Sequence, residues 1–166
     1  MKRDIRIKIQ SSIYEVEESL FSFDPEASDK NIFDDEDLTK AAEPEIMSIN
    51  TVGVLNDDGE RISISYTEPD GSGMDGSQTT ISFLKAEPNV ITMSRTGLFA
   101  VTFVFEESKR YQCLYNTPYA PFSVCIHTKE VQNGIESYRH DLWLDYVVEI
   151  RGAAAERTKF KMQILY

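Results

Sequence analysis

The chain has 166 residues, of which 28 are acidic and 17 are Lys or Arg, so its net charge at pH 7 is −11. This length predicts one domain, residues 1–166, that can bury a core without disulfides. Its apolar runs fall far short of the roughly 20 residues of a membrane helix, and its start lacks the apolar stretch of a signal peptide, so we expect a soluble, cytoplasmic protein.

The negative charge is concentrated in one segment. Residues 15–45 hold 12 of the 28 acids and only two basic residues, Lys30 and Lys40. The remaining chain is nearly neutral, with 16 acids and 15 basic residues. Binding to nucleic acid or to an anionic membrane requires a basic face, so we expect neither as a partner.

The first predicted strand precedes an acidic insertion. Residues 5–9 alternate between isoleucine and basic residues, which is typical of a half-buried strand. The insertion, residues 17–44, contains an acidic run at 34–37 that suits the start of one short helix, with Pro44 ending it. The insertion also contains three phenylalanines, which predict partial order rather than full disorder.

The next segments predict a hairpin and a loop. Residues 46–55 and 61–67 alternate on either side of an Asn-Asp-Asp-Gly turn at 56–59, so they are expected to pair. Residues 68–76 contain three glycines, which predict an irregular, mobile loop.

Further strands are predicted at residues 78–84 and 90–95, each followed by turn residues. The segment 98–105 is apolar on both faces. This pattern predicts a central strand whose outer side is covered by the insertion or by a second subunit.

A hairpin with prolines in its turn is predicted from residues 109–115 and 122–131. If the turn is centred on Tyr119, Cys113 and Cys125 face each other across it. We expect both thiols to be reduced, because two cysteines are too few for a disulfide framework. No second Cys or His pair completes a metal site, so no metal is expected.

Residues 142–150 are the clearest half-buried strand, and the alternating residues 160–166 are expected to close the sheet. Nine or ten strands are therefore expected in total. The pattern predicts an all-β fold, and it leaves a barrel and a sandwich open as alternatives.

Three motifs of this sequence resemble the YwiB-like family of uncharacterised bacterial proteins, domain of unknown function 1934. They are Arg-Thr-Gly at 95–97, Tyr-Asn-Thr-Pro-Tyr at 115–119, and the strand 142–150 with its central Tyr146. The resemblance covers about residues 46–166 and the first strand. It implies a closed antiparallel barrel of the lipocalin-like, or calycin, type with about 8–10 strands. It implies no activity.

Such a barrel can bind one small ligand at an open end. The candidate ligand contacts are Arg95, Tyr115, Tyr146, His140 and Tyr66. Each also has a structural interpretation: the phenols fill the interior, Arg95 braces the barrel, and His140 is hydrogen-bonded where a strand begins.

No nucleophile with a defined partner accompanies His140, and His127 is expected on the outer face, so we expect no enzyme. No cofactor is expected either, because the glycine loop lacks the lysine of a phosphate loop and the Asp residues do not match a calcium loop. Two functions remain. One is binding of a small, partly apolar ligand, and the other is a noncatalytic module whose insertion or 98–105 strand binds a protein partner or a second copy.

Overall fold

In the computed structural model, residues 1–16, 43–150 and 153–166 are described, and these ranges contain ten strands and no helix. The strands are β1 (Lys2–Glu15), β2 (Glu45–Asp57), β3 (Arg61–Thr67), β4 (Gln78–Leu84), β5 (Glu87–Thr96), β6 (Val101–Phe105), β7 (Arg110–Tyr115), β8 (Phe122–Asn133), β9 (Asp141–Ile150) and β10 (Ala153–Leu165). Within the described ranges, no helix is long and apolar enough to cross a membrane. The helix predicted from residue 34 onward, like most of the insertion 17–44, lies outside the described residues.

All ten strands belong to one antiparallel sheet that curls until its end strands meet. The order is β6-β5-β4-β3-β2-β1-β10-β9-β8-β7. Between the two end strands only one bridge is formed in the described part of the chain, where Ala100 and Asn116 exchange backbone hydrogen bonds of 3.0 and 2.8 Å. The predicted all-β antiparallel barrel is therefore confirmed, but the barrel is nearly closed rather than fully closed.

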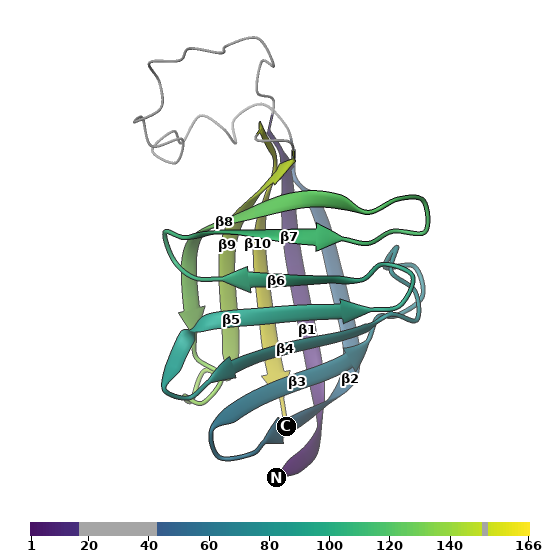
Figure 1. The fold of residues 1–166 in the computed structure, drawn as a ribbon. Coiled ribbons are helices and arrows are strands. Elements are labelled where there is room, and N and C mark those ends of the chain that lie inside the picture. The colour runs from purple at the N-terminus through teal and green to yellow at the C-terminus, as the bar shows by residue number, and fades with distance from the viewer. Residues whose placement is uncertain (17–42, 151–152) are drawn as a thin grey trace.

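The barrel is flattened into two layers whose strands cross steeply. In Figure 1, β3 to β7 run across the view in front of the upright strands β1, β2, β9 and β10. Strand β8 starts beside β7 and bends to run beside β9 (Figure 1), and the register of that pair shifts between Thr128 and Glu130. An extra residue at such a bulge bends the strand, which lets β8 connect the two layers.

Alternation along each strand decides which side chains fill the interior. Ile5, Ile7 and Ile9 of β1 are all buried, as predicted. They pack in one core with inward-facing residues of the other strands, including Ile64, Phe83, Phe105, Leu142 and Leu144. Burying each such side chain contributes roughly 1.5–3 kcal/mol, so this core is the main source of stability.

Gly53 allows β2 to pack closely against its neighbours β1 and β3. A Cβ atom on Gly53 would lie 2.6 Å from Cδ1 of Ile7 and 2.6 Å from the carbonyl oxygen of Ser65. The second of these is a backbone atom and cannot move aside. Only glycine therefore fits where β2 runs between its two neighbours.

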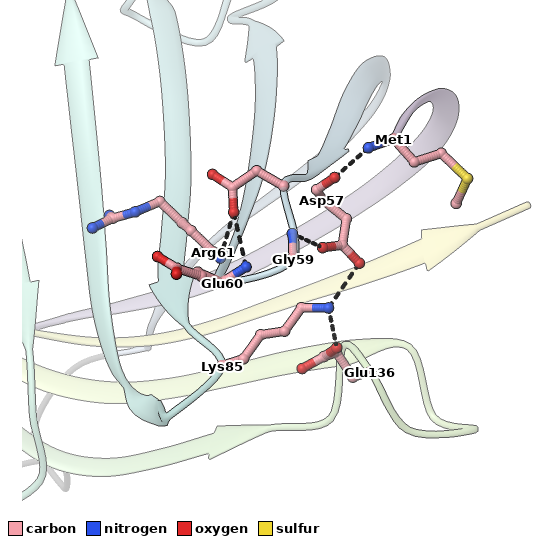
Figure 2. Close-up of polar contacts among 8 residues, drawn as sticks. Met1, Asp57, Gly59, Glu60, Arg61, Lys85 and Glu136 are labelled. Atoms are coloured by element: carbon pink, nitrogen blue, oxygen red, sulfur yellow. Dashed lines mark hydrogen bonds and ion pairs between the residues drawn. The ribbon is translucent and has the colours of Figure 1, made fainter.

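Polar contacts tie three turns together at what we call the closed end of the barrel, around Asp57, Lys85 and Glu136. Nζ of Lys85 lies 2.8 Å from the Asp57 carboxylate and 3.3 Å from the Glu136 carboxylate (Figure 2). The Met1 amino group donates to the Asp57 carbonyl oxygen, and the Gly59 N–H donates to the Asp57 carboxylate at 2.9 Å (Figure 2). The turns after β2, β4 and β8 are thus joined.

The predicted register of the β7–β8 hairpin is wrong by one residue. Cys113 pairs with Val124, so Cys125 lies on the opposite face, and both thiols are free. The turn comprises residues 116–121, an even number, so no single residue lies at its centre.

The prediction of a central strand at 98–105 is also wrong. Only its second half forms β6, which lies at one end of the sheet. Leu98 belongs to the preceding turn and is 71% exposed. In β6, Val101 and Phe105 face the core and Thr102 between them is exposed, so this strand alternates like the others. The apolar residues of the preceding turn made the segment 98–105 resemble a strand that is buried on both faces.

Candidate functional site

A cavity of about 160 Å³ lies inside the barrel at the end opposite Lys85. We call this the open end. Strand β1 ends here at Glu15, β2 begins here at Glu45, and Glu156 lies near the start of β10. The lining comes from β1, β2, β3, β5, β6, β9, β10 and the loop 68–76. Cavities of roughly 150 Å³ in other proteins hold molecules of the size of benzene, so this volume admits a small ligand.

Two lining residues, Arg95 and Glu68, form a hydrogen-bonded polar cluster with Thr79. Arg95 donates from Nε to the Thr79 hydroxyl at 3.2 Å, and its Nη2 lies 3.4 Å from Oε1 of Glu68. The Thr79 hydroxyl donates to the same carboxylate oxygen at 2.7 Å. Thr79 is fully buried, and the side chains of Glu68 and Arg95 are 4% and 15% exposed. Glu68 is thus a buried carboxylate that is both paired and hydrogen-bonded.

Tyr66 adds a phenol to the lining beside this cluster. Its side chain is 4% exposed, and burial, followed by the charge of Glu68, raises its pKa above the ordinary value of 10.0. The hydroxyl therefore keeps its proton at neutral pH and can donate a hydrogen bond into the cluster or to a ligand.

The register of the sheet explains why these residues meet. Tyr66 pairs with Thr79, and Thr79 pairs with Arg95, so the three lie side by side on the inner face of β3, β4 and β5. Glu68 follows β3 directly, and its backbone N–H donates to the Ser77 carbonyl at 2.8 Å. The chain therefore turns back at Glu68, which places this carboxylate beside Arg95.

The loop 68–76 borders the cavity. It is irregular, as predicted, and it is folded into turns, one of which is held by the Gly71 N–H donating to the Asp75 carboxylate at 2.8 Å. This conformation brings Met74 to the cavity, with its sulfur 3.8 Å from the Tyr115 hydroxyl. The mobility of the loop stays a prediction.

The opposite wall carries a second carboxyl group, that of Glu156. Glu156 and Thr158 of β10 line the cavity, and Thr158 pairs with Tyr146 of β9. Burial raises the pKa of Glu156, and the nearby carboxylates of Glu45 and Glu15 raise it further. Among the described residues, the structure pairs Glu156 with no basic side chain.

Three of the five predicted ligand contacts, Arg95, Tyr66 and Tyr146, line this one cavity. Burial raises the pKa of Tyr146 to about 12, so its phenol is neutral at pH 7. Tyr115 lies next to the lining rather than within it, and its ring packs 6.3 Å from that of Phe103, a lining residue.

His140 lies at the closed end, so the structure does not bring it to the other four residues. It has a φ of 50°, its Nδ1 is 3.2 Å from the Ile135 carbonyl oxygen, and its ring packs edge-on against Tyr166 at 4.8 Å. A second cavity of about 170 Å³ lies here, bordered by His140, Arg3 and Tyr166. Alternation predicts whether a side chain faces the interior or the exterior of the barrel. It does not predict at which end of the barrel the residue lies, because that depends on its position along the strand.

His127 lies on the outer face, as predicted. Its Nδ1 accepts a hydrogen bond from Nε of Arg110 at 3.1 Å, and Arg110 also pairs with Glu149 at 3.0 Å. Burial and then the Arg110 charge lower the pKa of His127 to about 4, so it is neutral at pH 7. In the part of the chain that the structure describes, no group of acidic, His or Cys residues could hold a metal ion.

A family model described as Domain of unknown function (DUF1934) matches residues 34–162. The chain belongs to this family. The resemblance noted in the sequence is thereby confirmed. No match was found among functionally curated proteins.

A solved structure shows the same fold as this DUF1934 chain. It is the crystal structure of the ywiB protein from Bacillus subtilis, which is 10% identical, with a TM-score of 0.65 over 99% of this chain and 94% of that chain. At this level of identity the likeness shows the fold alone.

Sequence reasoning missed three polar residues of this DUF1934 barrel: Glu68, Thr79 and Glu156. Thr79 lies two residues before Ile81 and so shares its inward face, and Glu156 continues backward the alternation of Phe160. Extending each pattern by one or two steps would have found both. Glu68 lies in the loop after β3, outside any alternation, and no sequence signal marks it.

Proposed function

We propose that this DUF1934 barrel is a noncatalytic, lipocalin-like binding protein that takes one small, partly apolar molecule into the cavity at its open end. The observation that carries the proposal is the cavity itself, which combines apolar walls with the buried cluster of Arg95, Thr79 and Glu68. Ligand sites generally have this composition, with a few placed polar groups in a mainly apolar lining.

The apolar walls contain flexible side chains that can adapt to the shape of a ligand. Met47, Met74 and Met93 line the cavity together with Phe103 and Phe160. Methionine side chains are flexible and polarizable, so they adapt to an inserted molecule at low cost.

The lining also supports a binding role rather than a catalytic one. It contains no histidine and no cysteine among the described residues, and its one arginine already contacts Glu68. The two free cysteines, Cys113 and Cys125, support a location in the reducing cytoplasm.

The five natural methionines provide the test. Met47, Met74 and Met93 line the cavity, whereas Met162 is fully buried in the core and Met1 is exposed at the closed end. With ¹³C-methyl methionine, benzene-sized fragments are expected to shift the NMR signals of the three cavity methionines while those of Met1 and Met162 stay in place. If no fragment in a broad set moves the three signals, the proposal is wrong.

One observation favours a second candidate, a module that binds a protein partner or a second copy. Leu98 and Leu114 are 71% and 56% exposed, and they lie in the segments that the bridge between Ala100 and Asn116 joins. If this surface binds another chain, replacing both leucines with serine should lower the mass found by sedimentation to that of a monomer. An unchanged mass would remove binding of a second copy through this surface.

A further inference from the structure

We propose that the molecule bound in this cavity is a small organic ammonium ion, with its charge near Glu156 and its apolar body among the aromatic and methionine side chains. This inference rests on the proposed function, because it names the ligand class of the same cavity.

The charges of the cavity are unbalanced. Arg95 is the one basic residue of the lining among the described residues, and it lies 3.4 Å from Glu68 on the same wall. Glu156 on the other wall is paired with no basic side chain in the described ranges. Two more acids stand at this end, because Glu15 pairs with Glu156 in the sheet and Glu45 faces β1 across from residue 13. The cavity therefore presents excess negative charge to anything that enters it.

Glu156 is only weakly satisfied by its own neighbours. Within the part of the chain that the structure describes, its side chain accepts one hydrogen bond, from the Thr158 hydroxyl at a long 3.5 Å. Burial disfavours the ionised form of this carboxyl, so a cation beside it would relieve that penalty on binding. A neutral ligand would offer no such gain.

Aromatic rings surround the same space. Tyr66, Phe103, Tyr146 and Phe160 line the cavity from four different strands, β3, β6, β9 and β10. Ammonium groups are attracted to the faces of aromatic rings, and protein sites for quaternary ammonium ions are built from several such rings. Both phenols are uncharged at pH 7, because burial raises the pKa of Tyr146 to about 12 and that of Tyr66 further.

An anionic ligand fits these observations less well. It would need Arg95, whose Nε already donates to Thr79 and whose Nη2 faces Glu68. Its negative charge would also meet the carboxyl of Glu156 across the cavity. Anion binding is therefore kept as an outcome of the test.

Three probes of matched shape separate the ligand classes: choline, its neutral isostere 3,3-dimethylbutan-1-ol, and the anion 3,3-dimethylbutanoate. Each is titrated into the full chain while the NMR signals of Met47, Met74 and Met93 are followed. We expect choline to bind at least about tenfold more tightly than the neutral alcohol, as a desolvated ammonium among aromatic rings should. The carboxylate should bind most weakly.

Two variants locate the effect. In Glu156→Gln the preference for choline over the neutral alcohol should fall to near parity. Glu60→Gln removes the same charge at the closed end (Figure 2) and should leave the preference intact, which controls for the overall charge of the protein.

The possible failures can be told apart. If the alcohol or the carboxylate binds as tightly as choline, or if the preference persists in Glu156→Gln, the ammonium inference is overturned and the cavity remains a binding site. If none of the three probes moves the signals of the three methionines, the ammonium inference is overturned, and the broad fragment set then decides whether the proposed function is wrong as well.

Discussion

The two ends of this barrel hold their charged groups in opposite ways. At the closed end, Asp57, Lys85 and Glu136 lie at the surface and join three turns above a core of isoleucine, leucine and phenylalanine. At the open end, Arg95, Glu68 and Glu156 line the cavity, and Glu156 is paired with no basic side chain among the described residues. The strands that carry apolar core residues in the middle of the barrel carry polar and flexible residues at the open end. The candidate site is formed by these residues and needs no separate motif.

The electrostatic consequences also have opposite signs. The hydrogen bond from Lys85 lowers the pKa of Asp57, so ionisation of this group favours the folded state. Burial raises the pKa of Glu156, so its ionisation opposes folding. Groups that cost stability in the free protein are common at binding sites, because function rather than stability retains them.

The largest expected difference between the two ends is in packing. Ile64 is fully buried in the core, whereas Ile49 is partly buried and lines the cavity. Ile64→Ala should lower the free energy of unfolding by about 3–4 kcal/mol, because it leaves a hole in a filled interior. Ile49→Ala, which only enlarges an existing cavity, should cost about 1 kcal/mol. Urea unfolding measures both, and equal losses would mean that the open end is packed like the core.

The next effect comes from the two ion pairs. Arg95→Met leaves the buried Glu68 carboxylate without its cation and should cost about 2–3 kcal/mol. Lys85→Met breaks the contact with the surface carboxylate of Asp57 and should leave the urea midpoint almost unchanged. Similar midpoints for the two variants would contradict the assignment of Arg95 and Glu68 as a buried pair.

The smallest expected difference is in how stability depends on pH, because the ionised carboxyl groups at the two ends affect stability in opposite directions. The pKa of Glu156 is raised in the folded state above its ordinary value of 4.5. The wild type therefore loses stability as the pH rises from 4.5 through this raised pKa. Glu156→Gln should therefore melt at a higher temperature than the wild type at pH 7, and this advantage should vanish below about pH 4.

Asp57→Asn is the matched test at the closed end. The stabilisation by Asp57 is present above its ordinary pKa of 3.8 and is lost as the pH falls through its lowered pKa. This variant should therefore melt at a lower temperature than the wild type at pH 7 and approach it in strong acid. Shifts of the same sign in both variants would remove the electrostatic contrast between the two ends.

Much of the fold could be predicted from local patterns. Alternation gave the number of strands and the inward faces of β1 and β9, because each half-buried strand repeats every two residues. Pairing across turns was less secure. The register at Cys113 and the central position expected for residues 98–105 both depended on where a turn lies, and apolar turn residues such as Leu98 obscured that boundary.

The candidate site was only partly predictable, for a related reason. Tyr66, Arg95 and Tyr146 were found because they are inward-facing polar residues of strands. His140 was grouped with them because alternation does not tell the two ends of a barrel apart. Glu68 was missed because its position depends on how a loop folds back over the barrel, which is a tertiary feature.

The most direct test of the central claim is a crystal structure of the full chain soaked in the neutral alcohol 3,3-dimethylbutan-1-ol, which probes the cavity independently of charge. We expect electron density for one molecule between Met47, Met93 and Tyr146, and none among Ile64, Phe83 and Leu144. An interior at the open end that is filled by the protein's own side chains, with the alcohol absent, would contradict it.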